Sequence, residues 1–256
     1  MTALYHDIIF GPIHSRRLGL SLGVNLLPTE SKLCSFDCIY CECGWNAEHP
    51  GQRRFNRRDD VHRLLEETLR KMVAAGTPPD VITFAGNGEP TMHPEFGAII
   101  DDTLTLRDQL CPAAKVSVLS NATQIGRADV RQALLKVDNN ILKLDSAFDE
   151  TVRLMNNPCG NYAVADVVRN MQLFNGKLIL QTMFLRGEYK GHAIDNTTDK
   201  EVAAWLKLVA EIRPAKVMVY SLDRDTPCQT LQKVTKEELS RIAIQVEALG
   251  IPCPVA

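Results

Sequence analysis

Four of the eight cysteines in this 256-residue chain lie in one short stretch, SKLCSFDCIYCECGW, residues 31–45. Cys34, Cys38 and Cys41 have the spacing C-x3-C-x2-C, and Cys43 follows two residues later. Thiolates bind iron–sulfur clusters, and four of them normally close a four-iron cube. Three would leave one iron open to an outside ligand, which is of no use to a structural site and of direct use to catalysis. The spacing therefore predicts a catalytic metal centre on the three cysteines.

Two other interpretations of these cysteines remain open. Cys43 would complete a closed, all-thiolate zinc site, although structural zinc more often uses two separated C-x2–4-C pairs. Cys38 and Cys41 alone spell C-x-x-C, a redox motif of thioredoxin-like folds that leaves Cys34 unexplained. The scattered cysteines either join Cys43 in an auxiliary cluster or are ordinary core residues; they are Cys111, Cys159, Cys228 and Cys253.

A second polar motif, FAGNGEPTMHPEF (residues 84–96), lies about fifty residues after the cysteines. Its glycines permit a close approach of the backbone to a ligand. Glu89 and exposed carbonyls of the turn could accept hydrogen bonds from an ammonium group. His93, between a methionine and a proline, more simply shapes a turn, so it is not assigned to catalysis.

The elements that must position these motifs are short apolar strands that alternate with amphipathic helices. The predicted strands, several of them continuing into a polar turn, are 21–27, 81–90, 115–123, 140–146, 177–185 and 215–224. Helices are predicted over 59–76, within 95–110, and over 127–137 and 166–174. Two more helices are predicted to begin at capping boxes, Thr198 with Glu201 and Thr235 with Glu238.

Apolar strands that are each followed by a helix imply a parallel sheet covered on its outer face. Six such units are fewer than the usual eight, so we expect an α/β fold, a partial (β/α)6 TIM-type barrel with parallel strands. A single domain is expected over residues 1–256, with the cluster loop, 34–41, after the first strand. In βα barrels the chemistry lies at the carboxyl ends of the strands, where GNGEP, SNAT, LDS, QTMF and YSLDR fall.

The cysteine spacing, with Tyr40 directly before the last cysteine, and the following GNGE turn resemble the signature of the radical S-adenosylmethionine (SAM) superfamily. The resemblance implies a [4Fe-4S] cluster and S-adenosyl-L-methionine as cofactors. In that family the open iron binds the amino and carboxylate groups of SAM. One electron from the reduced cluster then cleaves SAM to methionine and a 5′-deoxyadenosyl radical, which abstracts hydrogen from a substrate. The cofactor carries this chemistry, and the protein orients and shields it.

The family pattern also suggests which residues bind SAM. Its glycine-rich turn holds the methionine amino group, and that position is matched by Gly86, Asn87, Gly88 and Glu89. Asn87 departs from the more common Gly-Gly-Glu form. By position alone, three polar residues are candidates for contacts with the nucleoside portion: Asn121, Asp145 and Gln181.

Longer segments of the chain resemble the branch related to tRNA wyosine-base (4-demethylwyosine) synthases, among them GPIHSRRLGLSLGVNLLP, LSNAT, LKLDS and VYSLDRDTP. A tRNA base is therefore the leading substrate hypothesis. Modification of a peptide or protein, including formation of a glycyl radical on a partner enzyme, is the alternative, and a non-catalytic metal-binding module is a third. The wyosine synthases carry a second cluster on extra N-terminal cysteines, whereas this sequence has no cysteine before Cys34. A flavodoxin or ferredoxin is the expected electron donor.

Two basic features admit more than one role. GQRRFNRRDD, residues 51–60, is either a phosphate-binding patch with a stacking aromatic or a solvated segment partly neutralised by its own aspartates. We favour the second, because the net charge of −2 offers no wider basic surface, although Arg16 and Arg17 could extend the patch. Lys143 could form a Schiff base, since wyosine synthesis consumes pyruvate through a lysine, but a salt bridge inside the barrel is the favoured role.

The composition, 45% apolar and 23% charged, is that of a globular protein. No apolar stretch approaches eighteen residues, so no transmembrane helix or membrane partner is predicted. The first residues lack the pattern of a secretory signal. We therefore expect the cytoplasm, where disulfides rarely persist and clustered cysteines indicate metal ligands or reactive thiols.

Overall fold

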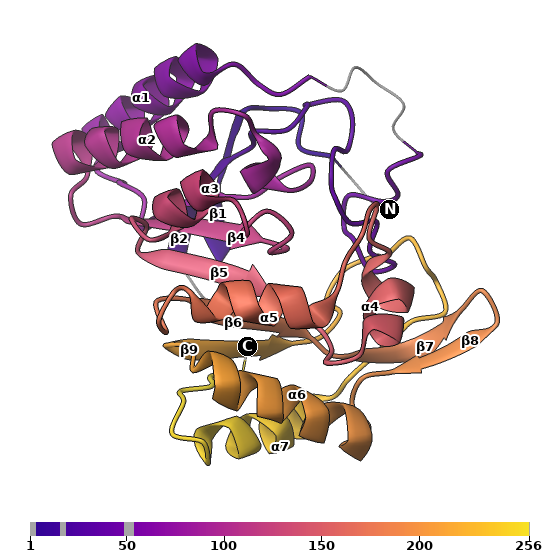
Figure 1. The fold of residues 1–256 in the computed structure, drawn as a ribbon. Helices are drawn as coiled ribbons and strands as arrows, with labels where there is room; N and C mark the ends of the chain where they lie inside the picture. Colours follow the sequence, from indigo (N-terminus) through magenta and orange to yellow (C-terminus); the bar gives the residue numbers. More distant parts are fainter. Residues whose placement is uncertain (1–3, 16–18, 49–53, 256) are drawn as a thin grey trace.

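A computed structural model describes residues 4–15, 19–48 and 54–255 of the chain (Figure 1). In this part of the chain a seven-stranded sheet has the order β1-β2-β3-β4-β5-β6-β9. Its strands are β1 (Ile9–Ser15), β2 (Gly19–Val24), β3 (Val81–Phe84), β4 (Lys115–Ser120), β5 (Asn139–Lys143), β6 (Ile179–Met183) and β9 (Lys216–Tyr220). β1 pairs antiparallel with β2, and the strands from β2 to β9 pair parallel.

Helices follow the parallel strands in turn, and Figure 1 shows most of them along one side of the sheet, with α4 set apart from this layer. They are α1 (Arg58–Ala74), η1 (Pro90–Met92), α2 (Phe96–Leu110), α3 (Ala128–Leu134), α4 (Asp149–Asn156), α5 (Val164–Gln172), α6 (Asp199–Ile212) and α7 (Lys236–Glu247). The six parallel strands and the helices that follow them confirm the predicted partial (β/α)6 barrel. No helix in the described ranges is both long and apolar enough to cross a membrane.

The core forms because each element buries one apolar face. All four residues of β3, Val-Ile-Thr-Phe, are buried, as a strand covered on both sides requires. α1 buries Val61, Leu65, Leu69 and Met72, which recur at helical spacing. A second apolar cluster includes Phe36, Ile39 and Tyr40 of the cysteine loop itself. The candidate site is therefore surrounded by packed side chains.

Several elements differ from the sequence prediction. The first parallel strand ends at Val24 rather than residue 27, because the Asn25 side chain accepts a hydrogen bond from the Leu27 N–H, a turn characteristic of asparagine. β1 and α4 were not predicted. Nor were the strands of a separate antiparallel sheet, β7 (Leu185–Tyr189), β8 (His192–Asp195) and β10 (Gln232–Lys233), in the order β10-β7-β8.

One of the two predicted capping boxes is wrong. Thr235 and Glu238 exchange both hydrogen bonds at the start of α7. Thr198 caps α6 with its own side chain, but the Glu201 carboxylate binds two hydroxyls elsewhere, those of Ser146 and Thr151, each at 2.6 Å. These longer-range partners replace the reciprocal bond and connect α6 to the end of β5 and to α4.

Candidate functional site

The cysteine loop follows β2 and is fixed on one side by the glycine turn, residues 86–89. Leu33, directly before the first cysteine, donates its N–H to the Asn87 carbonyl at 2.8 Å and accepts from the Glu89 N–H at 3.2 Å. These bonds form a short parallel bridge between Leu33 and Gly88. The two sequence motifs are therefore in direct contact.

This contact depends on the glycines of the turn. Gly86 and Gly88 have φ angles of 132° and 144°, which side-chain-bearing residues rarely adopt. A Cβ atom at Gly88 would lie 1.8 Å from the Leu33 carbonyl oxygen, and one at Gly86 would lie 2.5 Å from Asn25 Oδ1. Any other residue at Gly88 would force the turn away from the cysteine loop.

Asn87 has its side chain turned into the protein. Its Oδ1 accepts from the Tyr5 N–H, and its Nδ2 donates to the carbonyls of Tyr5 and Pro28, all at 2.8 Å. The amide therefore stabilises the turn against the preceding chain, which a glycine at this position could not do. This accounts for the departure from Gly-Gly-Glu, and the contact of Asn87 with SAM stays a prediction.

Glu89 is 2% exposed and accepts four hydrogen bonds. Its Oε1 accepts from the N–H and hydroxyl of Thr91 and from Ser120 Oγ, and its Oε2 accepts from the Asn121 N–H at 2.6 Å. Burial raises the pKa of this carboxyl, and the four donors oppose that rise. Glu89 thus connects the glycine turn to the polar end of β4.

Asn121 extends this connection to the cysteines. Its Nδ2 donates to Ser35 Oγ at 2.9 Å and lies 3.6 Å from Cys34 Sγ. Its Oδ1 accepts from the N–H and hydroxyl of Thr123. A residue predicted to lie at the site is therefore next to the first cysteine, and its amide donates toward that sulfur.

The other side of the cysteine loop is fixed by the end of α4. The Asp37 N–H donates to the Asn156 carbonyl at 2.9 Å, and the Ile39 N–H donates to the Met155 carbonyl at 3.0 Å. The last carbonyls of a helix have no N–H donor within the helix, and these two bonds supply donors to them. The loop is therefore clamped between the glycine turn and a helix that the sequence analysis missed.

A buried polar network lies beside Cys38. The Tyr40 hydroxyl donates to Asp145 Oδ2. Asn156 Nδ2 lies 2.7 Å from Tyr40 Oη, 2.8 Å from Asp145 Oδ2 and 3.5 Å from Cys38 Sγ. Burial, together with the charge of Asp145, raises the pKa of Tyr40, so its hydroxyl stays protonated. Tyr40 and Asp145, both predicted as site residues, are thus joined by Asn156, which was not.

Lys143 forms the ion pair favoured by the sequence analysis. Its Nζ lies 3.7 Å from Asp145 Oδ2, donates to the Tyr220 hydroxyl at 3.1 Å and lies 5.0 Å from the centre of the Tyr40 ring. Burial is the largest influence and lowers the pKa of Lys143, but Asp145, Tyr220 and Cys38 together outweigh it and raise that pKa overall. The raised pKa disfavours the neutral amine of a Schiff-base lysine. Gln181 is the β6 register partner of Lys143 and shares its face of the sheet.

Lys32 is the most deeply buried charged group of the loop and was not predicted. It is 1% exposed, and its ammonium donates to Asp37 Oδ1 at 3.1 Å and to the Gly44 carbonyl at 2.6 Å. Burial disfavours its charge, yet the nearby cysteine thiols and Asp37 raise the pKa of Lys32 overall. The loop is therefore built around a permanent cation.

The three thiols of the motif differ in environment. Burial raises the pKa of Cys34, and it raises the pKa of Cys38 to about 11. A hydrogen bond from the Cys43 thiol lowers the pKa of Cys41. All three are free cysteines. Metal ligation requires thiolates, so binding of iron would release protons, above all from Cys34 and Cys38.

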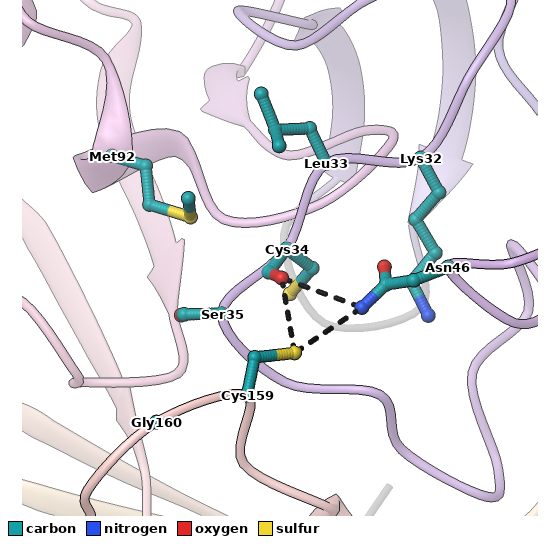
Figure 2. Close-up of a pocket in the computed structure, with 8 residues that line it drawn as sticks. All are labelled: Lys32, Leu33, Cys34, Ser35, Asn46, Met92, Cys159 and Gly160. Atoms are coloured by element: carbon teal, nitrogen blue, oxygen red, sulfur yellow. Dashed lines mark hydrogen bonds between the residues drawn. The ribbon is translucent and has the colours of Figure 1, made fainter. Parts of the chain in front are cut away.

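Two further cysteines contact the loop, in addition to Cys43. Cys228 does so through its backbone, whose N–H donates to the Ile39 carbonyl at 3.2 Å, while its thiol donates to the Glu188 carbonyl at 3.5 Å. Cys159 contacts the loop with its side chain. Its thiol is 3.7 Å from the Cys34 carbonyl oxygen and accepts from Asn46 Nδ2 at 3.5 Å (Figure 2). These residues line a pocket of about 430 Å³ together with Lys32, Leu33, Ser35, Met92 and Gly160. Cys111 and Cys253 belong to the main core, and Cys228 to the second apolar cluster. The candidate ligands of an auxiliary cluster are thus dispersed.

In its described part, the arginine-rich segment fits a solvated segment partly neutralised by aspartates rather than a phosphate-binding patch. Arg58 forms a two-pronged ion pair with Asp102 at 2.6 and 2.8 Å, and Arg57 lies 3.6 Å from Asp59. Phe55 packs edge-on against His93. Three of the arginines considered lie outside the described residues: Arg16, Arg17 and Arg53.

His93 shapes a turn, as expected. Its Nδ1 accepts from the Glu95 N–H at 3.0 Å, so its Nε2 carries the proton and donates to the Asn56 carbonyl at 2.8 Å. Both ring nitrogens are therefore engaged, and the ring is 2% exposed.

The donor set suits an iron–sulfur cluster. Three thiols come from one loop beside a buried cation, and buried amides donate toward Cys34 and Cys38. In the described ranges no three His, Cys, Asp or Glu side chains meet closely enough for a single metal ion. A cluster places its thiolates on different irons, so it does not require the sulfurs to meet at one point.

Comparisons with known proteins agree with this chemistry. The family model described as the Radical SAM superfamily matches residues 31–199. A UPF0026 protein of Methanocaldococcus jannaschii is 32% identical over 214 residues, which are 82% of this chain and 61% of that protein. A UPF0026 protein of Synechocystis sp. is 31% identical over 226 residues, 86% of this chain and 77% of that protein. The chain thus spans about three fifths of the first relative.

Solved structures show the same fold at low identity. A radical SAM methyltransferase from Sphaerobacter thermophilus has a TM-score of 0.68 at 15% identity, over 92% of this chain and 65% of that chain. TYW1 with a lysine-pyruvate adduct bound has a TM-score of 0.60 at 12% identity, over 89% of this chain and 73% of that chain. The family match overturns the zinc-module alternative, and the shared fold excludes the thioredoxin-like one. The chain belongs to the UPF0026 family of the radical SAM superfamily, and it is a radical SAM enzyme whose cofactors are a [4Fe-4S] cluster and SAM.

Proposed function

We propose that Cys34, Cys38 and Cys41 ligate the [4Fe-4S] cluster and leave its fourth iron to SAM. The loop that carries them is fixed on both sides, by the glycine turn and by the end of α4. Cys43 is assigned no iron, because it lies outside the C-x3-C-x2-C spacing and its thiol donates to the Gly86 carbonyl at 3.5 Å. When bound and reduced, the cluster supplies the electron that cleaves SAM to methionine and a 5′-deoxyadenosyl radical.

The protein's own residues orient SAM and exclude water. We assign the methionine amino group to the turn at Gly86 and Gly88, whose backbone can approach a ligand closely. Because all four hydrogen bonds of Glu89 go to protein donors, this carboxylate supports the turn more than it contacts the cofactor. The nucleoside portion is assigned to Tyr40 and to three polar residues at strand ends, Asn121, Asp145 and Gln181.

For the substrate, we propose a base of an RNA, with tRNA as the leading candidate. The observation that carries this proposal is an aromatic pair beside the cysteine loop, in which the half-buried rings of Trp45 and Tyr189 stack at 5.7 Å. Lys190 places its ammonium 5.1 Å from the Tyr189 ring. Aromatic surfaces with adjacent cations bind unpaired bases and their phosphates. The likeness in fold to TYW1 supports the proposal, while the described arginines at positions 57 and 58 do not, because they pair with aspartates.

A peptide or protein substrate is the second candidate. β8 is the edge strand in the order β10-β7-β8, and its other edge pairs with no strand in the described chain. An extended peptide can add to such an edge through backbone hydrogen bonds. SuiB, solved with a precursor peptide, has a TM-score of 0.64 at 14% identity over 89% of this chain.

The test of the cofactor assignment begins with anaerobic reconstitution with iron and sulfide. We expect about four irons per chain, as a four-iron cluster requires. After reduction by dithionite, 5′-deoxyadenosine should form from SAM. Cys34→Ala, Cys38→Ala and Cys41→Ala should each abolish cleavage, whereas Cys43→Ala should retain it. Cleavage by any of the first three with an intact cluster would exclude that residue as a ligand.

The substrate is tested by binding. A gel shift with unmodified tRNA should weaken with rising salt, as phosphate contacts require, and should weaken further in Trp45→Ala. Leu249→Ala, at an exposed apolar residue far along the chain, is the matched control. No binding to tRNA at low salt would exclude the RNA proposal and favour the peptide candidate. A flavodoxin or ferredoxin should replace dithionite as the one-electron donor.

A further inference from the structure

The buried ammonium of Lys32 neither ligates the proposed cluster nor is assigned to SAM. It is among the largest side chains of the described chain with less than 2% exposure, and the only charged one among them. Lys32 stands two residues before Cys34 and lines the same pocket, as Figure 2 shows. A lysine this deeply buried is rare unless something compensates its charge.

The loop wraps itself around this ammonium. Asp37, which accepts at 3.1 Å, lies between the first two cysteines of the motif, and Gly44, whose carbonyl accepts at 2.6 Å, follows the third. The Gly44 N–H in turn donates to the Cys41 carbonyl at 3.0 Å. The cation therefore sits inside the turn that presents all three thiols.

Asp37 does not cancel the cation completely. Its side chain is 17% exposed, while that of Lys32 is 1% exposed. Water screens the more exposed charge more strongly, so the field of the ammonium dominates inside the loop. The ammonium has three N–H donors, and it donates to the Asp37 carboxylate and to the Gly44 carbonyl. A cation held in this way favours additional negative charge on the sulfur side of the loop.

We infer that Lys32 is the fixed counter-charge of the cluster, which stabilises its reduced state and raises its reduction potential. This rests on the proposed ligation by Cys34, Cys38 and Cys41. One-electron reduction by a low-potential flavin or iron–sulfur protein adds a negative charge to a cluster that its thiolates already make anionic. Net charge, hydrogen bonds to sulfur and solvent exposure set the potentials of such clusters. Lys32 is thus a positioning residue that eases electron entry before SAM is cleaved.

The test is a redox titration of the reconstituted protein without SAM, followed by the electron paramagnetic resonance of the reduced cluster. Lys32→Met keeps the length of the side chain and removes the charge. We compare the two proteins at the potential where the wild-type cluster is half reduced. There the ratio of reduced to oxidised cluster in Lys32→Met should be lower by about tenfold or more, which corresponds to a reduction potential lower by about 59 mV for one electron. The matched control is Lys136→Met, because Lys136 pairs with Asp101 at the surface and is 48% exposed.

A second variant makes the inference independent of whether Lys32→Met retains iron. Asp37→Asn keeps an oxygen that can accept from the ammonium but removes the negative charge, so its potential should shift in the opposite, positive direction. Shifts no larger than that of Lys136→Met in both variants would overturn the inference, as would a negative shift in Asp37→Asn. A wild type without a cluster would instead overturn the proposed function, and iron analysis distinguishes this from an unshifted potential.

Discussion

Glu89→Gln tests whether the buried carboxylate anchors the site. The amide oxygen of glutamine can still accept from Thr91 and Ser120, but its NH2 group would face the Asn121 N–H, which now donates to Oε2 at 2.6 Å. A hydrogen bond to a charged group contributes about 1.5–3 kcal/mol, and a buried donor left without an acceptor costs about 1–3 kcal/mol. We therefore expect the free energy of unfolding to fall by about 2–3 kcal/mol.

The assay is anaerobic thermal unfolding of the reconstituted protein, with iron analysis of the same samples. A loss of this size should lower Tm by roughly 5–10 °C in a chain of this length. The matched control is Glu95→Gln, at an exposed glutamate close by that makes no side-chain cap, and it should change stability by less than about 0.5 kcal/mol.

The pH dependence gives a second, independent readout. Burial raises the pKa of Glu89 above its ordinary value of 4.5, so in the window above that value the folded protein binds more protons than the unfolded chain. Stability from this group therefore falls as pH rises through the raised pKa. Glutamine does not titrate, so the variant should lose this slope. An unchanged Tm and an unchanged slope would refute the anchoring role, and an unchanged Tm with loss of SAM binding would assign Glu89 to the cofactor directly.

Three further predictions concern local structure. Gly88→Ala should lose iron in reconstitution, because its Cβ would lie 1.8 Å from the Leu33 carbonyl oxygen; normal iron content would show that the loop can move. Thr235→Ala removes the capping box of α7 and should cost about 1 kcal/mol in the free energy of unfolding, measured by denaturant titration. His93→Gln should remove a rise of stability with pH below about 6.5, since burial lowers the pKa of His93 and the unfolded chain takes up its proton first. An identical pH profile in the variant would contradict that assignment.

The barrel was predictable because apolar residues recur with different periodicity in its strands and in its helices. The apolar runs that became β3 to β6 are buried on both faces, and their alternation with helices leaves few topologies. α4 escaped prediction because it has only eight residues and its N-cap, Phe148, makes no side-chain cap. The β7–β8 hairpin also gave little pattern, since its strands have five and four residues and are partly exposed.

The residues of the candidate site also differ in how far the sequence reveals them. Residues whose role needs a special backbone, such as Gly88, or a fixed spacing, such as the cysteines, leave a mark in the sequence. Lys32 and Asn156 leave none, because nothing in their neighbours distinguishes a buried lysine or amide from an exposed one. Their positions arise from tertiary contacts: Asn156 reaches Cys38 only because α4 ends against the loop, and Lys32 is buried only because the loop closes over it through Gly44. The groups that adjust the electrostatics of the cluster are therefore those that depend on the folded chain, whereas the groups proposed to ligate it can be identified from the sequence.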